Sequence, residues 1–202
     1  METVELWRIK QLAEASREAV WNIAKAHGYE PKIYLHWSAG KYNTPFNDYH
    51  INILGDGKIV ISTTDFSEVK NHTWRRNSGS IGIALACAYG ASSANLGGYP
   101  PTAKQIEVMA QVINAVATGW WLTIDKAHVL THGEAANNED GGIGTHEPYA
   151  WWNDSYGDGD TRGDLEYLGT DESPRYNPWA KDGSRGGDIL RGKANWYRQQ
   201  GR

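Results

Sequence analysis

Two histidines stand near the ends of short segments from which an imidazole could face a cleft. His36 lies near the end of KIYLHWS and His132 near the end of DKAHVLTHGE, and small residues follow each of them. Short segments rich in β-branched and aromatic residues are typical of strands. Two neutral imidazoles and one further carboxylate or thiol are a ligand set for a zinc ion that keeps one position open. The pattern therefore allows a three-ligand zinc site, although a single histidine of this kind is more often a surface or partly buried side chain.

The spacing of the residues does not select the third ligand. His128 lies four residues before His132, but in a strand their Cα atoms would be about 13 Å apart. That is too far to share a zinc ion with bonds of about 2.1 Å, so we predict a structural role for His128. The remaining candidates for the third ligand are His146, Asp154, Asp158, Asp160, Asp164 and Cys87. Of these, Cys87 lies in an apolar run, where a small core side chain is the simpler interpretation.

Three helices are predicted from the apolar periodicity and the capping residues. Apolar side chains spaced three and four apart predict an N-terminal helix over residues 4–27. Thr102 and Gln105 form a capping-box pattern, which predicts a helix over residues 103–119. The segment 187–200 predicts a terminal helix.

The strands come mainly from the middle of the chain. YHINILG and KIVIST flank Asp56-Gly57, a pattern that predicts a β-hairpin. The apolar run 80–88 predicts a strand buried on both faces, and 125–134 a further short strand. Residues 133–163 have no usable periodicity, and a loop of that length is usually functional or disordered. Together these elements predict an α/β fold, with a mixed central β-sheet flanked by helices in a single domain.

The composition excludes several classes of protein. The 202 residues fit one domain. With 20 basic and 24 acidic side chains the net charge is −4, which argues against a nucleic-acid partner. One cysteine excludes an intrachain disulfide, and no apolar run is long enough to span a membrane. The N-terminus lacks the apolar core of a secretory signal, so we expect synthesis in the cytoplasm, and we expect a monomer.

Tryptophan is the unusual feature of the composition, with ten residues against two phenylalanines. Four tryptophans lie on or after predicted helices, where packing is the favoured role: Trp7, Trp21, Trp120 and Trp121. Three others lie in loops near the candidate ligands: Trp74, Trp151 and Trp152. For this second group a binding groove and a packing role are equally good interpretations.

An ordered set of segments resembles a known family. The segments are YLHWSAG, YHINILGDGKIV, NHTWRRNSGSIGIAL, PTAKQ, VLTHGE and TRGDLEYLG, over about residues 30–170. They resemble the zinc-dependent N-acetylmuramoyl-L-alanine amidases of the type-2 family, which includes phage endolysins and peptidoglycan recognition proteins. The resemblance implies zinc as cofactor, peptidoglycan as substrate, and hydrolysis of the amide between N-acetylmuramic acid and L-alanine.

The resemblance also implies roles for individual residues. The implied zinc ligands are His36, His132 and Asp164. The implied catalytic residues are Tyr49, near the attacking water, and Arg162, aimed at the scissile carbonyl. Many relatives carry a glutamate where this chain has Ala84, which leaves Glu134 and Tyr49 as candidates for the general base. The candidate substrate-binding residues are His72, Asn77 and, from its loop position, Trp74.

The sequence leaves three functions open. The first is a peptidoglycan amidase of the endolysin kind, which reaches the cell wall through a separate membrane pore (a holin) or after host lysis. The second is a non-catalytic module that binds muropeptides on the same scaffold. The third, a glycosidase with two carboxylates, is disfavoured because no acidic pair stands out. The sequence assigns no role to residues 171–202.

Overall fold

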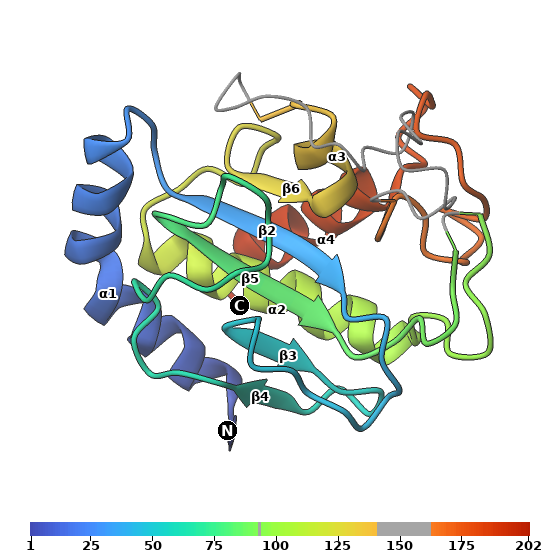
Figure 1. Ribbon diagram of the computed structural model, residues 1–202, viewed down its shortest axis with the longest axis horizontal. Coiled ribbons are helices and arrows are strands. Elements are labelled where there is room, and N and C mark those ends of the chain that lie inside the picture. Colours follow the sequence, from blue (N-terminus) through green and yellow to red (C-terminus); the bar gives the residue numbers. More distant parts are fainter. Residues whose placement is uncertain (93, 141–162) are drawn as a thin grey trace.

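The computed structural model describes residues 1–92, 94–140 and 163–202, and its centre is a six-stranded mixed sheet (Figure 1). The strands are β1 (Glu2–Val4), β2 (Lys32–Trp37), β3 (Ile51–Ile53), β4 (Ile59–Ile61), β5 (Ser80–Leu85) and β6 (Val129–Thr131). Their order across the sheet is β1-β4-β3-β5-β2-β6. The four neighbouring strands β3, β5, β2 and β6 are parallel to one another. β4 is antiparallel to β3, and β1 is antiparallel to β4. The carboxyl ends of the parallel strands therefore lie at one edge.

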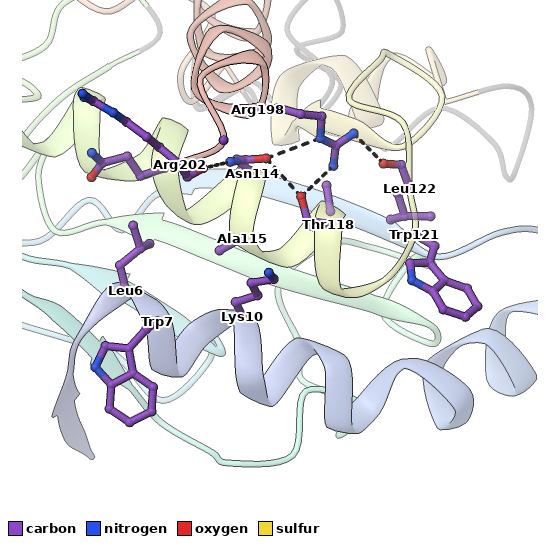
Figure 2. Close-up of a pocket in the computed structure, with 13 residues that line it drawn as sticks. Leu6, Trp7, Lys10, Asn114, Ala115, Thr118, Trp121, Leu122, Arg198 and Arg202 are labelled. Carbon is purple, nitrogen blue, oxygen red and sulfur yellow. Dashed lines mark hydrogen bonds between the residues drawn. The ribbon is translucent and has the colours of Figure 1, made fainter.

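The four helices described are α1 (Leu6–Ala26), α2 (Ala103–Gly119), α3 (His132–Ala136) and α4 (Gly186–Gln199). The three long helices lie side by side against one face of the sheet, with α2 in the middle (Figures 1 and 2). The expected mixed sheet flanked by helices in one domain is thus the observed fold. Within the described ranges, no helix has the length and apolar character needed to cross a bilayer.

Strand alternation separates the apolar core from the polar face of β2. Successive side chains of a strand point to opposite faces of the sheet. Ile33 and Leu35 join the main hydrophobic core, which includes the buried faces of α1 and α2. Tyr34 lies outside that core, and His36 shares its face of the sheet. One strand therefore supplies both core packing and a polar side chain for a site.

The packing of α1 on α2 depends on small side chains. A Cβ atom added at Gly119 would lie 2.6 Å from the Cβ atom of Ala13, so the two helices approach closely there. Trp120 directly follows α2, is fully buried, and donates an Nε1 hydrogen bond to Ser16 Oγ at 3.1 Å. This contact fixes the end of α2 against α1.

The predicted elements mostly agree with the structure, with three corrections. The hairpin around Asp56-Gly57 and the capping box of α2 are confirmed. The segment 125–134 is not one strand, because β6 ends at Thr131 and a helix begins there. The strand β1 was not predicted. Trp7 and Trp121 were expected to pack, but 67% and 74% of their surfaces are exposed.

Candidate metal centre

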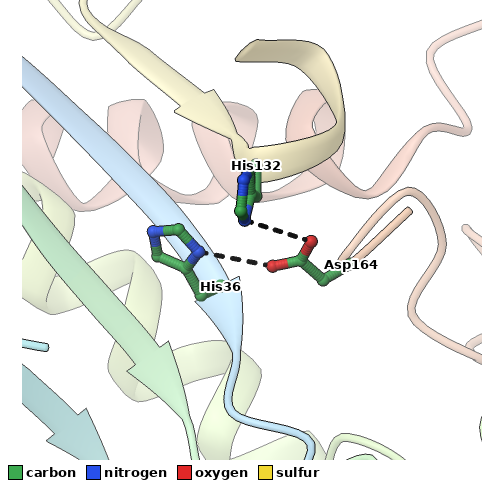
Figure 3. A group of neighbouring side chains, drawn as sticks. All are labelled: His36, His132 and Asp164. Carbon is green, nitrogen blue, oxygen red and sulfur yellow. Dashed lines mark ion pairs between the residues drawn. The ribbon is translucent and has the colours of Figure 1, made fainter. Parts of the chain in front are cut away.

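His36, His132 and Asp164 converge at the carboxyl edge of the parallel strands (Figure 3). The Nδ1 atom of His36 lies 3.4 Å from Asp164 Oδ2, and the Nδ1 atom of His132 lies 3.6 Å from Asp164 Oδ1. One ligand atom from each side chain falls within 4.8 Å of the others, and all three side chains are buried. This is the one such group of histidine, cysteine and acidic side chains found in the part of the chain that the structure describes.

The spacing of these atoms fits a zinc ion. Zinc in proteins is usually tetrahedral, and bonds of about 2.1 Å place neighbouring ligand atoms about 3.4 Å apart. The two nitrogen-to-oxygen separations, 3.4 and 3.6 Å, match that edge length. Two imidazoles and one carboxylate also leave a fourth position for water, which is the ligand set of a catalytic rather than a structural zinc site.

The fold explains why His36 and His132 meet although they are far apart in sequence. β2 and β6 are adjacent and parallel, so both end at the same edge. His132 was expected at the end of a strand, but it is the first residue of α3. A capping box starts this helix: the Thr131 hydroxyl accepts from the Glu134 amide, and the Glu134 carboxylate accepts from the Thr131 amide. Asp164 comes from a segment without regular structure.

A hydrogen-bonded threonine orients His36. Thr73 Oγ1 lies 3.3 Å from His36 Nε2 and 2.8 Å from His72 Nδ1. A hydroxyl group has one proton, so it accepts from the first imidazole when it donates to the second. With Thr73 donating to His72, the proton of His36 would lie on Nε2, and its Nδ1 atom would face Asp164 as a metal ligand. Metal-binding histidines commonly use such a partner to fix the tautomer.

His72 lies directly behind this site and is neutral. Burial lowers the pKa of His72 well below its usual value, and the neighbouring imidazoles of His36, His50 and His132 lower it further. Its Nε2 atom is buried and has no hydrogen-bond partner among the residues that the structure describes. His72 thus belongs to a cluster of imidazoles that pack edge to face, with its ring centroid 5.3 Å from that of His36.

Tyr49 and Ala84 border His36. The rings of Tyr49 and His36 have centroids 5.1 Å apart, and Tyr49 is half-buried. Ala84 on β5 is the direct partner of His36 in the sheet register. At the position where the resemblance implies a glutamate, this chain therefore has the methyl group of Ala84 beside His36.

Glu134 is buried and bound to arginine. Burial alone would raise the pKa of Glu134, but hydrogen bonds and the charge of Arg191 lower that pKa to about 2. Two contacts join the carboxylate to the guanidinium, at 2.8 and 2.9 Å. A carboxylate held this way stays ionised and is a poor proton acceptor at neutral pH.

The sequence reasoning missed Glu166, a second buried glutamate near the cluster. Burial raises the pKa of Glu166 to about 7, and the charge of Glu134 adds to this, while Arg185 opposes it. Its carboxylate accepts from Arg185 Nε at 2.8 Å. Its position in the sequence is the available signal: Glu166 follows Asp164 by two residues, as Glu134 follows His132 by two residues.

The candidate substrate residues lie in one loop between β4 and β5. Asn77 accepts hydrogen bonds from the backbone amides of His72 and Thr73 through its Oδ1 atom, so it shapes this loop. Trp74 is 37% exposed and its ring stacks with the Arg75 guanidinium. A role in binding substrate stays a prediction for His72, Trp74 and Asn77.

Several predicted residues lie outside the described ranges. They are His146, Trp151, Trp152, Asp154, Asp158, Asp160 and Arg162. Two others lie within those ranges but not in the cluster. His128 contacts Glu30 and Asp125, which agrees with a structural role, and Cys87 is fully buried.

A separate cavity of about 690 Å³ lies on the helical face (Figure 2). It is lined by residues of α1, α2, the turn after α2, and the end of the chain from α4 onward, among them Trp7, Trp121 and Arg198. None of the three clustered side chains lines it. The cavity is therefore distinct from the candidate metal centre.

The structure thus places a buried His-His-Asp group, of a composition that could hold a metal ion, at the carboxyl edge of a mixed sheet. The chain belongs to the N-acetylmuramoyl-L-alanine amidase family, Amidase_2, whose profile matches residues 11–147. This is the family whose resemblance was seen in the sequence motifs, and it acts on peptidoglycan. Asp164 lies beyond the matched residues, so its place in the cluster rests on the structure.

Solved structures with partial similarity include endolysins and a peptidoglycan recognition protein. The Ph2119 endolysin from Thermus scotoductus MAT2119 bacteriophage Ph2119 shares 18% identity over 57% of this chain and 77% of its own, with a TM-score of 0.40. The endolysin LysCS from Clostridium intestinale URNW shares 17% identity over 54% of this chain and 72% of its own, with a TM-score of 0.39. Drosophila PGRP-LB shares 21% identity over 67% of this chain and 85% of its own, with a TM-score of 0.40. No curated protein matches the sequence.

Proposed function

We propose that this protein is a zinc-dependent amidase that cleaves the bond between N-acetylmuramic acid and L-alanine in peptidoglycan. The observation that carries the proposal is the convergence of His36, His132 and Asp164, with Nδ1-to-carboxylate separations of 3.4 and 3.6 Å. A zinc ion bound there would lower the pKa of water to about 7 and polarise the amide carbonyl. Family membership supports the peptidoglycan substrate.

The chain's own residues have separate tasks in this proposal. Thr73 would hold the imidazole of His36 in the tautomer whose Nδ1 atom can bind the metal ion. Tyr49, beside His36, holds or passes the proton that the leaving amine requires, because the Glu134 carboxylate is ion-paired with Arg191. The sequence prediction for Arg162, stabilisation of the oxyanion, is kept as part of the proposal.

The first test is metal dependence. Chelation with EDTA is expected to abolish the release of free amines from purified peptidoglycan, and added zinc to restore it. Asp164→Ala is expected to lose stoichiometric zinc, whereas Asp171→Ala, at an exposed aspartate of the same segment, is expected to keep it. Amine release unaffected by chelation would reject the mechanism, and full zinc content in Asp164→Ala would reject this ligand.

The second test separates Tyr49 from the metal ligands. Tyr49→Phe is expected to lower kcat about 100-fold or more, the usual contribution of acid–base catalysis, with zinc content unchanged. Stopped assays of amine release give kcat, and metal analysis of the same preparation gives the zinc content. An unchanged kcat would remove Tyr49 from the proton-transfer step.

Ala84 favours one alternative function. The methyl group beside His36 leaves that strand position without a carboxylate, which suits a module that binds muropeptides without cleaving them. Such a module would bind purified peptidoglycan in a pull-down and release no amines. For the amidase, we propose the route of an endolysin, with action on the wall as a monomer after passage through a holin pore or host lysis.

A further inference from the structure

We propose that α4 is a positioning element for the candidate metal centre, acting through Arg185 and Arg191. This inference rests on the proposed metal function. His132 and Asp164 are each followed two residues later by a buried glutamate, Glu134 or Glu166. An arginine from α4 or its N-cap binds each glutamate. We call Arg185, Arg191, Glu134 and Glu166 the arginine clamp.

The first half of the clamp fixes the segment of His132. Arg191 donates from Nη1 to Glu134 Oε1 at 2.8 Å and from Nη2 to Glu134 Oε2 at 2.9 Å. The same guanidinium donates to the carbonyl of Val129 at 2.9 Å. One side chain of α4 therefore contacts both the first residue of β6 and the first turn of α3, and His132 lies between these two points in the sequence.

The second half of the clamp fixes the segment of Asp164. Arg185 Nε donates to Glu166 Oε2 at 2.8 Å, and the backbone amide of Gly186 donates to the Glu166 carbonyl at 2.9 Å. Arg185 also contacts both carboxylate oxygens of Glu139, at 3.0 and 3.2 Å. The start of α4 is thereby tied to the chain two residues after Asp164.

Thr131 joins the two halves. Its hydroxyl accepts from the amide of Glu134 at 3.1 Å and lies 3.1 Å from Glu166 Oε1, to which it donates its proton. The residue directly before His132 is therefore hydrogen-bonded to the glutamate that follows Asp164. All four clamp side chains and Thr131 are at least 92% buried, so solvent competes little for these bonds.

A pair of glycines allows this close approach. A Cβ atom at Gly186 would lie 1.8 Å from the carbonyl oxygen of Leu165, and one at Gly187 would lie 2.4 Å from Glu134 Oε1. Side chains at these positions would push α4 away from both ligand segments. The sequence Arg-Gly-Gly at the start of α4 therefore suits a helix that must contact this site.

The need for a clamp follows from where the ligands lie. His36 is on a six-residue strand that pairs on both sides, so the sheet holds it. His132 begins a helix of five residues, and Asp164 is in no helix or strand. Partners that orient metal ligands commonly contribute 10- to 100-fold to metal affinity. We assign that task to α4 for His132 and Asp164.

Metal affinity is the measurement that tests the clamp. Zinc affinity, determined by competition with a chromophoric chelator, is expected to fall about 10-fold or more in Arg185→Lys and Arg191→Lys. Lysine keeps the positive charge but loses the two-pronged geometry. Arg198→Lys is the matched control, because Arg198 lies on the same helix and donates to Leu122 and Thr118 instead. Its zinc affinity is expected to be unchanged.

A purely structural role makes a different prediction. It would lower the thermal midpoint of the metal-free variants but leave the zinc affinity of the folded protein at the wild-type value. That result would overturn the proposal that the arginine clamp positions the metal ligands. Affinities are compared at temperatures where circular dichroism shows each variant folded. If a lysine variant does not fold, Glu166→Gln, which keeps the shape of the side chain, is expected to show the same loss. Wild-type protein that binds no zinc would overturn the proposed function and the clamp together.

Discussion

Thr73 shows how much of the candidate centre depends on a single proton. Its hydroxyl contacts His36 and His72, and the direction of these two bonds decides which nitrogen of His36 carries hydrogen. His72 is neutral because burial and three nearby imidazoles lower its pKa, so it is available to accept the threonine proton. If Thr73 donates to His72, the tautomer of His36 that can bind a metal ion through Nδ1 is set before any ion binds.

Replacement of Thr73 tests this arrangement. Thr73→Val removes the acceptor for His36 Nε2 and is expected to lower zinc affinity about 10-fold. Thr73→Ser keeps the hydroxyl and is expected to retain most of the affinity. Chelator competition measures both variants. Equal affinities for valine and serine would show that the hydroxyl has no part in orienting His36.

His50 supplies a pH dependence of stability. Its Nε2 donates to the carbonyl of Glu68, and its Nδ1 accepts from the amide of Gly82, so both nitrogens are used by the neutral ring. Burial lowers the pKa of His50 from 6.5 to about 4. The unfolded chain therefore binds more protons than the folded chain between these pH values. Stability from this group is present above pH 6.5 and is lost as the pH falls toward 4.

The expected loss from His50 is at most about 3 kcal/mol over that interval. Urea unfolding at several pH values between 7 and 4.5 measures the slope in the wild type and in His50→Gln, where the slope should be shallower. His27→Gln, at the exposed residue that caps the carboxyl end of α1, is the control and should keep the wild-type slope. Identical slopes for all three proteins would remove His50 as the source.

At the scale of elements, sequence patterns predicted what depends on neighbours in the chain. The capping box of Thr102 and the hairpin at Asp56-Gly57 are local signals, and both elements are in the structure. Thr131 and Glu134 form the same capping pattern on either side of His132, but the apolar residues around them favoured a strand. The helix α3 was missed because its own signal spans only one turn.

Contacts between distant segments could not be predicted from the same patterns. Arg185 and Glu166 are separated by 19 residues, and Arg191 and Glu134 by 57. In the sequence these are ordinary charged residues in polar surroundings, and only the position of α4 shows that they are buried pairs. Asp164 was placed by family resemblance, because spacing alone left six candidates.

Two glycines test how closely the helices must pack. Ala is normally a better helix residue than Gly by about 1 kcal/mol. Gly192→Ala in α4 should follow that rule, because nothing lies within 4 Å of the added Cβ atom. Gly119→Ala should instead destabilise the protein by about 1–3 kcal/mol, because its Cβ atom would lie 2.6 Å from that of Ala13. Urea unfolding of both variants measures the difference, and stabilisation by Gly119→Ala would contradict the close approach of α1 and α2.

At the scale of the whole molecule, the candidate centre joins three parts of the chain. His36 comes from the central sheet, His132 from the start of α3, and Asp164 from the segment that leads to α4. An ion that binds all three would bind the folded chain far more tightly than the unfolded chain. Metal binding and global stability should therefore be coupled.

This coupling predicts a measurable gain in stability. At a free zinc concentration 100 times its Kd, binding to the folded state alone adds about 2.7 kcal/mol. For a chain of this size that corresponds to a rise of about 5–10 °C in Tm. Thermal unfolding with EDTA and with buffered zinc measures the shift in the wild type and in Asp164→Ala, which should lose most of it. Asp171→Ala should keep the full shift, because that side chain lies outside the cluster. If zinc raised the Tm of Asp164→Ala as much as that of the wild type, the stabilising ion would be bound elsewhere, and the link between this cluster and the global fold would be refuted.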